Sequence, residues 1–163
     1  MFVLGGNHHN VSTHYDEMLL YDTEHGEFSR HVSKGYEGDT MPLSRQAHSS
    51  TLFEDRIYLF GGFSEDSQLW RNDVCFFEPA HVLAGGSVEV CPLEVSGEVP
   101  EGRAAHAAEL LDGLLWIFGG NKQGNFFNDL HTLDLSSHKW KQVAVDYELS
   151  SFVPTPRAGK YSR

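Results

Sequence analysis

Short runs of consecutive apolar residues recur along this chain, and each run ends in a pair of glycines. The three runs are Met1–Leu4, Ile57–Phe60 and Leu115–Phe118. Apolar runs without alternation are typical of strands that are covered on both faces. The glycine pairs begin at Gly5, Gly61 and Gly119, which lie 56 and 58 residues apart. This regular spacing predicts one structural unit repeated along the chain, since such units bury their faces by stacking on their neighbours.

Polar residues flank the apolar runs at constant offsets. They are Arg45, His48 and Asp73 in the second repeat and Arg103, His106 and Asp129 in the third, where Trp140 follows. A residue at the same offset in every repeat is expected to make equivalent packing contacts in each of them, so we assign these positions a structural role. We expect each arginine and acid to neutralise one another, or to bind backbone groups between units, because buried charges need partners.

Each complete repeat predicts four strands. In the third repeat they are 106–111, 114–118, 130–135 and 140–145, and the first two are joined by the hairpin dipeptide Asp112-Gly113. The second repeat predicts the same series, with its fourth strand at 88–90 after a longer loop, 79–87. Four antiparallel strands in a unit of this length are typical of a propeller blade.

This succession of Arg-x-x-His, apolar strand, Gly-Gly, Asn-Asp and Trp resembles the kelch repeat, in register over nearly all 163 residues. The resemblance implies an all-β, kelch-type β-propeller. The chain would then hold about three four-stranded antiparallel blades of a ring of six or seven.

The expected blade boundaries leave the ring open. Residues 1–41 supply the last three strands of a blade, 42–99 and 100–153 a full blade each, and 154–163 the start of another. Three blades do not close a ring, because propellers typically have four to eight. Two interpretations remain: the chain is a piece of a longer propeller, or two chains associate to complete one ring.

Composition and charge exclude several classes of function. The formal net charge is −11, from 12 basic and 23 acidic residues, and no basic stripe offsets it, so we expect no nucleic-acid partner. No apolar run approaches the roughly 18 residues of a membrane-spanning helix, and no secretory signal is visible. The two cysteines, Cys75 and Cys91, make no disulfide framework, which favours a cytoplasmic protein.

Long, dissimilar loops follow the glycine pairs, and we expect binding there, because function concentrates on loops. In kelch proteins that bind peptide tails, contacts come from the residue after Gly-Gly and the residue after the arginine. The resemblance carries these contacts to Asn7, Phe63 and Asn121, and to Gln46, Ala104 and Ala158. We also expect exposed anchors at Trp70, Phe126 and Phe127, since aromatic residues dominate interface hot spots.

The resemblance therefore implies a protein-interaction module that acts as a scaffold or as a substrate-recognition adaptor, for example for a cullin ubiquitin ligase. Its partner would be a protein or a peptide. No catalytic residue, metal ligand or cofactor site is expected.

The alternative is a propeller enzyme of the galactose-oxidase or specifier-protein type, with its metal site in blades outside this sequence. The specifier iron motif is approached only by Glu17, Tyr21 and His25, which lack its aspartate. His8, His9 and His14 match no ligand spacing, and we interpret them as a solvated polar loop.

Overall fold

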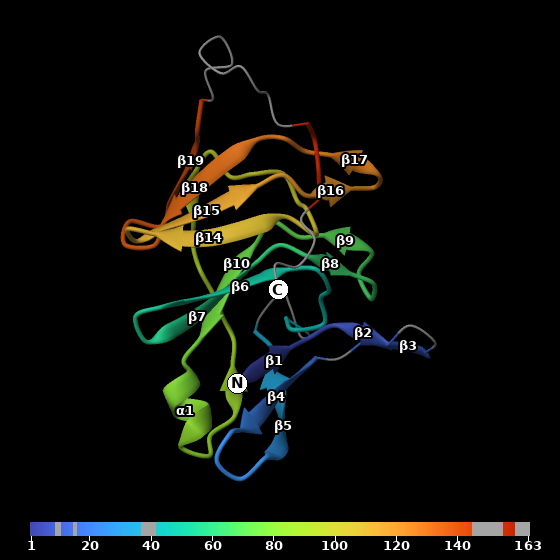
Figure 1. Ribbon diagram of the computed structural model, residues 1–163, viewed down its shortest axis with the longest axis vertical. Coiled ribbons are helices and arrows are strands. Elements are labelled where there is room, and N and C mark those ends of the chain that lie inside the picture. The colour runs from blue at the N-terminus through green and yellow to red at the C-terminus, as the bar shows by residue number, and fades with distance from the viewer. Residues whose placement is uncertain (9–10, 15, 37–41, 145–154, 159–163) are drawn as a thin grey trace.

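The computed structural model describes residues 1–8, 11–14, 16–36, 42–144 and 155–158 of the chain. These residues form three main sheets that lie one above another as layers of a stack (Figure 1). Each sheet consists mainly of antiparallel strands, with a strand of two residues at one edge. The architecture is all-β, as the sequence predicts, and the sheets correspond to propeller blades.

The first sheet has the strand order β1-β4-β5-β11. Its strands are β1 (Phe2–Leu4), β4 (Glu17–Asp22), β5 (Glu27–Lys34) and β11 (Val88–Glu89). β1 pairs with β4 and β4 with β5 in antiparallel fashion, whereas β11 adds to β5 in parallel.

The second and third sheets are built alike from the inner strand outward. The second has the order β6 (Ser49–Phe53), β7 (Arg56–Phe60), β10 (Val74–Phe77) and β12 (Cys91–Pro92). The third has the order β14 (Ala107–Leu111), β15 (Leu114–Phe118), β18 (Leu130–Asp134), β19 (Lys139–Gln142) and β13 (Ser96–Gly97). β13 lies parallel to β19. The apolar runs at Ile57 and Leu115 are thus central strands, which explains why they do not alternate.

Apolar side chains fill the spaces between successive sheets. One core cluster joins Met18 of the first sheet to Leu59 and Cys75 of the second. A second cluster joins Phe60 of the second sheet to Ile117 and other residues of the third, including Trp140. Each sheet therefore buries its faces only where a neighbouring sheet lies against it, as in other repeat proteins.

Two strand predictions need correction. The expected fourth strand at 88–90 is displaced: Val88–Glu89 extends the first sheet, and Cys91–Pro92 is the fourth strand of the second. The last strand of the third sheet is Lys139–Gln142, not 140–145, whose final residue lies outside the described residues. The strands expected for each blade do pair in antiparallel fashion, and β11 and β13 are additional edge strands that run parallel to their neighbours.

The predicted loops also contain regular structure. Each segment after a glycine pair forms a two-stranded hairpin: β2 (Asn7–His8) with β3 (Val11–His14), β8 (Phe63–Ser64) with β9 (Leu69–Trp70), and β16 (Asn121–Lys122) with β17 (Asn125–Phe126). The expected loop 79–87 begins with a short helix, α1 (Pro79–Leu83). The three hairpins project from the same side of the stack, and α1 lies on the opposite side (Figure 1).

Candidate protein-binding face

Two buried arginines fix the base of the hairpins. Arg45 is 1% exposed and its guanidinium donates to both carboxylate oxygens of Asp73, at 3.2 and 2.9 Å. It also donates to the carbonyl oxygens of Pro42 and Gly61, at 2.6 and 3.1 Å. These partners all belong to the second sheet or its flanks, so this ion pair lies within one unit.

The third repeat has the same arrangement. Arg103 is 0% exposed, contacts Asp129 at 2.6 and 2.9 Å, and donates to the carbonyl oxygens of Glu101 and Gly119 at 3.0 and 2.9 Å. Asp129 also lies 2.9 Å from His131. Although partial burial opposes ionisation, these hydrogen bonds and charges lower the pKa of Asp129 below its usual range. The carboxylate therefore stays ionised and matches the buried guanidinium.

The glycine pairs are where successive units meet. The amide of Gly62 donates to the carbonyl oxygen of Arg103 at 2.9 Å. In the same way, the amide of Gly120 donates to the carbonyl oxygen of Arg157 at 2.8 Å. A Cβ built on Gly61 would lie 2.8 Å from the same Arg103 oxygen. Glycine is thus required here because the backbone of the next unit approaches too closely for a side chain.

The repeated histidines lie beside this junction and are neutral. Burial is the main cause that lowers the pKa of His48 to about 4 and that of His106 to about 3, and neighbouring arginines add to it. His106 Nε2 lies 2.9 Å from Ser49 Oγ of the preceding sheet, and its ring packs edge-on against Phe60. These contacts suit a packing role between the second and third sheets.

The hairpins bring together the positions to which the resemblance assigns partner contacts. Gln46 and Phe63 form an isolated β-bridge, with both backbone hydrogen bonds at 2.9 Å. Ala104 and Asn121 form the equivalent bridge in the next unit. The residue after the arginine and the residue after Gly-Gly therefore lie side by side in both units. Asn7 lies in β2, and its side chain is outside the described part of the chain.

Two of the three aromatic anchors expected to be exposed are partly covered. Trp70 packs on Phe63, with ring centroids 4.4 Å apart. The guanidinium of Arg103 lies 4.2 Å above the ring centre of Phe127. Both side chains are half-buried, because each has folded back onto the base of its hairpin.

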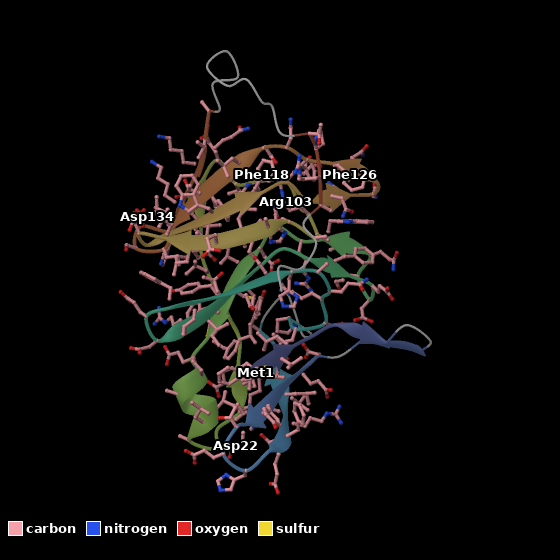
Figure 2. All side chains as sticks on the ribbon, in the orientation of Figure 1. Met1, Asp22, Arg103, Phe118, Phe126 and Asp134 are labelled. Carbon is pink, nitrogen blue, oxygen red and sulfur yellow. The ribbon has the colours of Figure 1, made fainter. Side chains whose placement is uncertain are left out.

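Phe126 remains available and is 54% exposed. It lies opposite Asn121 in the hairpin register, whereas Trp70 lies opposite Phe63. An asparagine offers no ring to cover an aromatic neighbour, so Phe126 stays exposed at the end of β17 nearer the hairpin base, on the side of the stack from which the hairpins project (Figure 2). The sequence pattern did not reveal a second exposed apolar side chain, Leu69, which is 59% exposed in β9. Its place in a hairpin strand gives the side chain no sheet to pack against.

Polar side chains at the hairpin bases hold them to the sheets. Ser44 donates a hydrogen bond to Asp66, and Gln46 donates to Glu65 at 3.2 Å. Lys122 and Glu101 form an exposed ion pair at 2.7 Å. The face therefore combines hydrogen-bonded polar groups with the exposed apolar side chains of Leu69 and Phe126. This arrangement is common at protein-binding surfaces.

The enzymatic alternative requires a metal site. The described residues contain no group of three or more His, Cys, Asp or Glu side chains that could hold a metal ion. His8, His9 and His14 lie outside the described side chains.

A cavity of ≈ 240 Å³ lies beside α1, and it is lined by Phe76, Phe77, Glu78, His81, Glu89 and Cys91. Within the same described ranges, no helix has the length and apolar character to cross a bilayer.

Comparison with known proteins agrees with this architecture. Residues 1–162 match the family model of the KLHDC2/KLHL20/DRC7 Kelch-repeats domain. The chain is 33% identical over 119 residues to acyl-CoA-binding domain-containing protein 4 of Arabidopsis thaliana, covering 72% of this chain and 16% of that protein. It is 36% identical over 111 residues to human Kelch domain-containing protein 3, covering 64% of this chain and 26% of that protein.

A further relative is the Drosophila melanogaster homolog of leucine-zipper-like transcriptional regulator 1, 27% identical over 151 residues, which cover 88% of this chain and 14% of that protein. The chain thus spans about a quarter or less of the curated relatives that it matches. With three stacked sheets, glycine-pair junctions and arginine–aspartate pairs in register, this chain belongs to the kelch-repeat family and forms part of a kelch β-propeller.

Proposed function

We propose that the hairpin face is a protein-binding site and that the chain serves as the recognition part of a scaffold or substrate adaptor. The face consists of the hairpins β8–β9 and β16–β17 with the adjoining residues Gln46 and Ala104. The observation that supports it best is the repeated bridge between the residue after the arginine and the residue after Gly-Gly. The framework is the same in both units while the bridged side chains differ, which is how repeat proteins vary specificity on a constant scaffold.

Burial of two exposed apolar side chains supplies the binding free energy expected of such a site. Phe126 and Leu69 are more than half exposed, on hairpins whose bases are held by hydrogen bonds and ion pairs. Burying an aromatic side chain on a rigid surface contributes strongly to binding, since little conformational entropy is lost. The partner should therefore be a peptide or protein segment whose apolar side chains cover Phe126 and Leu69.

An adaptor role, including recruitment to a ubiquitin ligase, and a cytoplasmic setting are parts of the same proposal. The names of the relatives attach kelch-type sequence to an acyl-CoA-binding domain in one protein and to a leucine-zipper-like regulator in another. We infer that the propeller selects a partner and that neighbouring parts of each protein determine the fate of that partner. No metal, cofactor or catalytic group enters this proposal.

A peptide selected from a display library against this chain should lose affinity at least tenfold on Phe126→Ala. This loss, on the order of 1.4 kcal/mol or more, is typical of an aromatic hot spot. The matched control is Leu83→Ala, which removes a side chain 63% exposed in α1, on the opposite side of the stack. Calorimetric titration measures both variants, and their melting temperatures should remain within a few degrees of the parent. Unchanged binding by Phe126→Ala combined with loss in Leu83→Ala would place the site at α1.

A further inference from the structure

The connection between β10 and β12 is built differently from its counterpart in the third sheet, where a tight turn joins β18 to β19. Residues 78–90 first form α1 and then β11, which adds to the first sheet. The connection thus reaches from the second sheet to the first and returns. It supplies Glu78, His81 and Glu89 to the lining of the ≈ 240 Å³ cavity, and the strands that it joins supply Phe76, Phe77 and Cys91.

Core packing holds the walls of this cavity in place. Val88 and Val90 are 0% and 4% exposed in the core between the first and second sheets. Successive side chains of an extended segment point to opposite sides, so the alternate residues Glu89 and Cys91 are exposed and line the cavity. On the other wall, Val82 of α1 is buried in the same core. Anchored walls favour a preformed site, as is usual for ligand pockets.

The part of the chain that encloses the cavity is acidic. Between Arg71 and Arg103 there is no lysine or arginine, but there are six acids, among them Glu78 and Glu89. A hydrogen bond from Lys34 lowers the pKa of the Glu89 carboxyl below its ordinary value, so this group stays ionised at neutral pH. The field of such a segment attracts cations and repels anions.

Two cations of the chain show what these walls accept from outside the cavity. The guanidinium of Arg56 lies 4.5 Å above the ring centre of Phe76, and its Nε donates to Oε1 of Glu78 at 3.3 Å. Nζ of Lys34 donates to Oε1 of Glu89 at 3.3 Å. Neither cation lines the cavity, and Oε2 of each glutamate makes no hydrogen bond with a described residue. Both glutamates therefore keep an acceptor for a further cation.

The size and chemistry of the cavity fit the end of an arginine side chain. Its volume of ≈ 240 Å³ is far above the roughly 10–15 Å³ that admits one water. A guanidinium offers five N–H donors in a planar fork that matches carboxylate oxygens, and its plane stacks on aromatic rings, as Arg56 does on Phe76. A lysine ammonium supplies the charge but has no plane to stack.

We propose that the cavity beside α1 binds an arginine side chain of a partner protein, with the carboxylates of Glu78 and Glu89 as its acceptors. The site lies on the side of the stack opposite to the hairpins (Figure 1). It is independent of the hairpin face, so each site can be tested without the other. A chain that carries both sites holds two protein segments at once, one on each side of the stack.

Nuclear magnetic resonance titration of the ¹⁵N-labelled 163-residue chain tests the site. The probe is a peptide with capped ends in which two glycines flank one arginine on each side. We expect saturable shifts of the amide signals of residues 76–78, 81 and 89–91, with a Kd of about 1 mM or below. Citrulline in place of the arginine keeps the length and the planar end but not the charge, and should weaken binding at least tenfold. Lysine in its place should weaken binding at least threefold.

The double variant Glu78→Gln/Glu89→Gln removes both charges with little change in shape and should weaken binding of the arginine peptide at least tenfold. The matched control is Glu94→Gln/Glu109→Gln, which changes the net charge equally at two exposed acids outside the cavity and should leave binding unchanged. All four glutamates are exposed, so the melting temperatures of both variants should stay within a few degrees of the parent.

Four outcomes would overturn the proposal. The first is the absence of any shift at peptide concentrations up to roughly 10 mM. The second is equal binding of the arginine and citrulline peptides or of the arginine and lysine peptides. The third is an equal loss of affinity in the two double variants, which would show attraction by net charge alone. The fourth is a set of shifts confined to the hairpins 63–70 and 121–126, which would place the cation on the hairpin face.

Discussion

Replacing Asp129 by alanine is expected to lower the free energy of unfolding by on the order of 3 kcal/mol, since an unpaired buried charge is left behind. Arg103 is fully buried, and Asp129 supplies two of its hydrogen bonds, at 2.6 and 2.9 Å. Its remaining hydrogen-bond partners among the described residues are backbone carbonyl oxygens, which bear no full charge. Urea denaturation followed by circular dichroism measures the loss.

Lys122→Ala provides the control for this prediction. Lys122 also pairs with an acid, Glu101, at 2.7 Å, but both side chains are solvent-exposed to a large degree. Exposed ion pairs contribute roughly 0.5 kcal/mol or less. Similar urea midpoints for Asp129→Ala and Lys122→Ala would mean that the buried pair contributes no more to the free energy of unfolding than the exposed pair does.

Gly61→Ala is expected to cost about 3 kcal/mol or more, because two separate penalties act at this residue. Its φ of +64° lies in the left-handed region, where an alanine costs about 1 kcal/mol. The added Cβ would also lie 2.8 Å from the carbonyl oxygen of Arg103, a backbone atom of the next unit. Relieving that contact requires the second and third sheets to separate, which exposes their shared core.

The matched control is Gly124→Ala in the turn of the β16–β17 hairpin. Gly124 has a φ of +83°, and no atom lies within 4 Å of a Cβ built there. Only the backbone penalty applies, so we expect a loss of about 1 kcal/mol. Thermal or urea unfolding of both variants measures the difference. Equal losses would show that close approach between units is not the reason for the glycine pair.

Much of the fold follows from features that repeat in the sequence. The apolar runs before Gly61 and Gly119 locate the central strands, and the Asp112-Gly113 dipeptide locates the turn between β14 and β15. Repetition also identifies which arginine and which acid face the same junction. These features are predictable because they depend on local chain chemistry and on a constant spacing, both of which are visible in one sequence.

Other elements depend on tertiary contacts that a sequence pattern does not display. β11 and β13 are two residues long and pair in parallel with strands distant in the sequence. The hairpin strands of the second and third repeats are equally short, too short to show alternation. α1 has five residues, so no helical period can be recognised over it.

Which residues of the proposed site lie beside one another was easier to predict than how exposed their side chains are. The resemblance placed Gln46 and Ala104 near the residues after Gly-Gly, and the structure brings them together as bridged pairs. Exposure was harder to foresee, because it depends on cross-strand neighbours. Phe63 covers Trp70, whereas Asn121 leaves Phe126 exposed.

Hydrogen-exchange mass spectrometry on the chain, with and without its selected peptide, measures directly where the partner binds. We predict that bound peptide slows exchange in the hairpins 63–70 and 121–126 and at the adjoining residues Gln46 and Ala104. Exchange in α1 and around its cavity should not change. Protection confined to residues 79–91, with the hairpins unaffected, would contradict the hairpin face as the binding site.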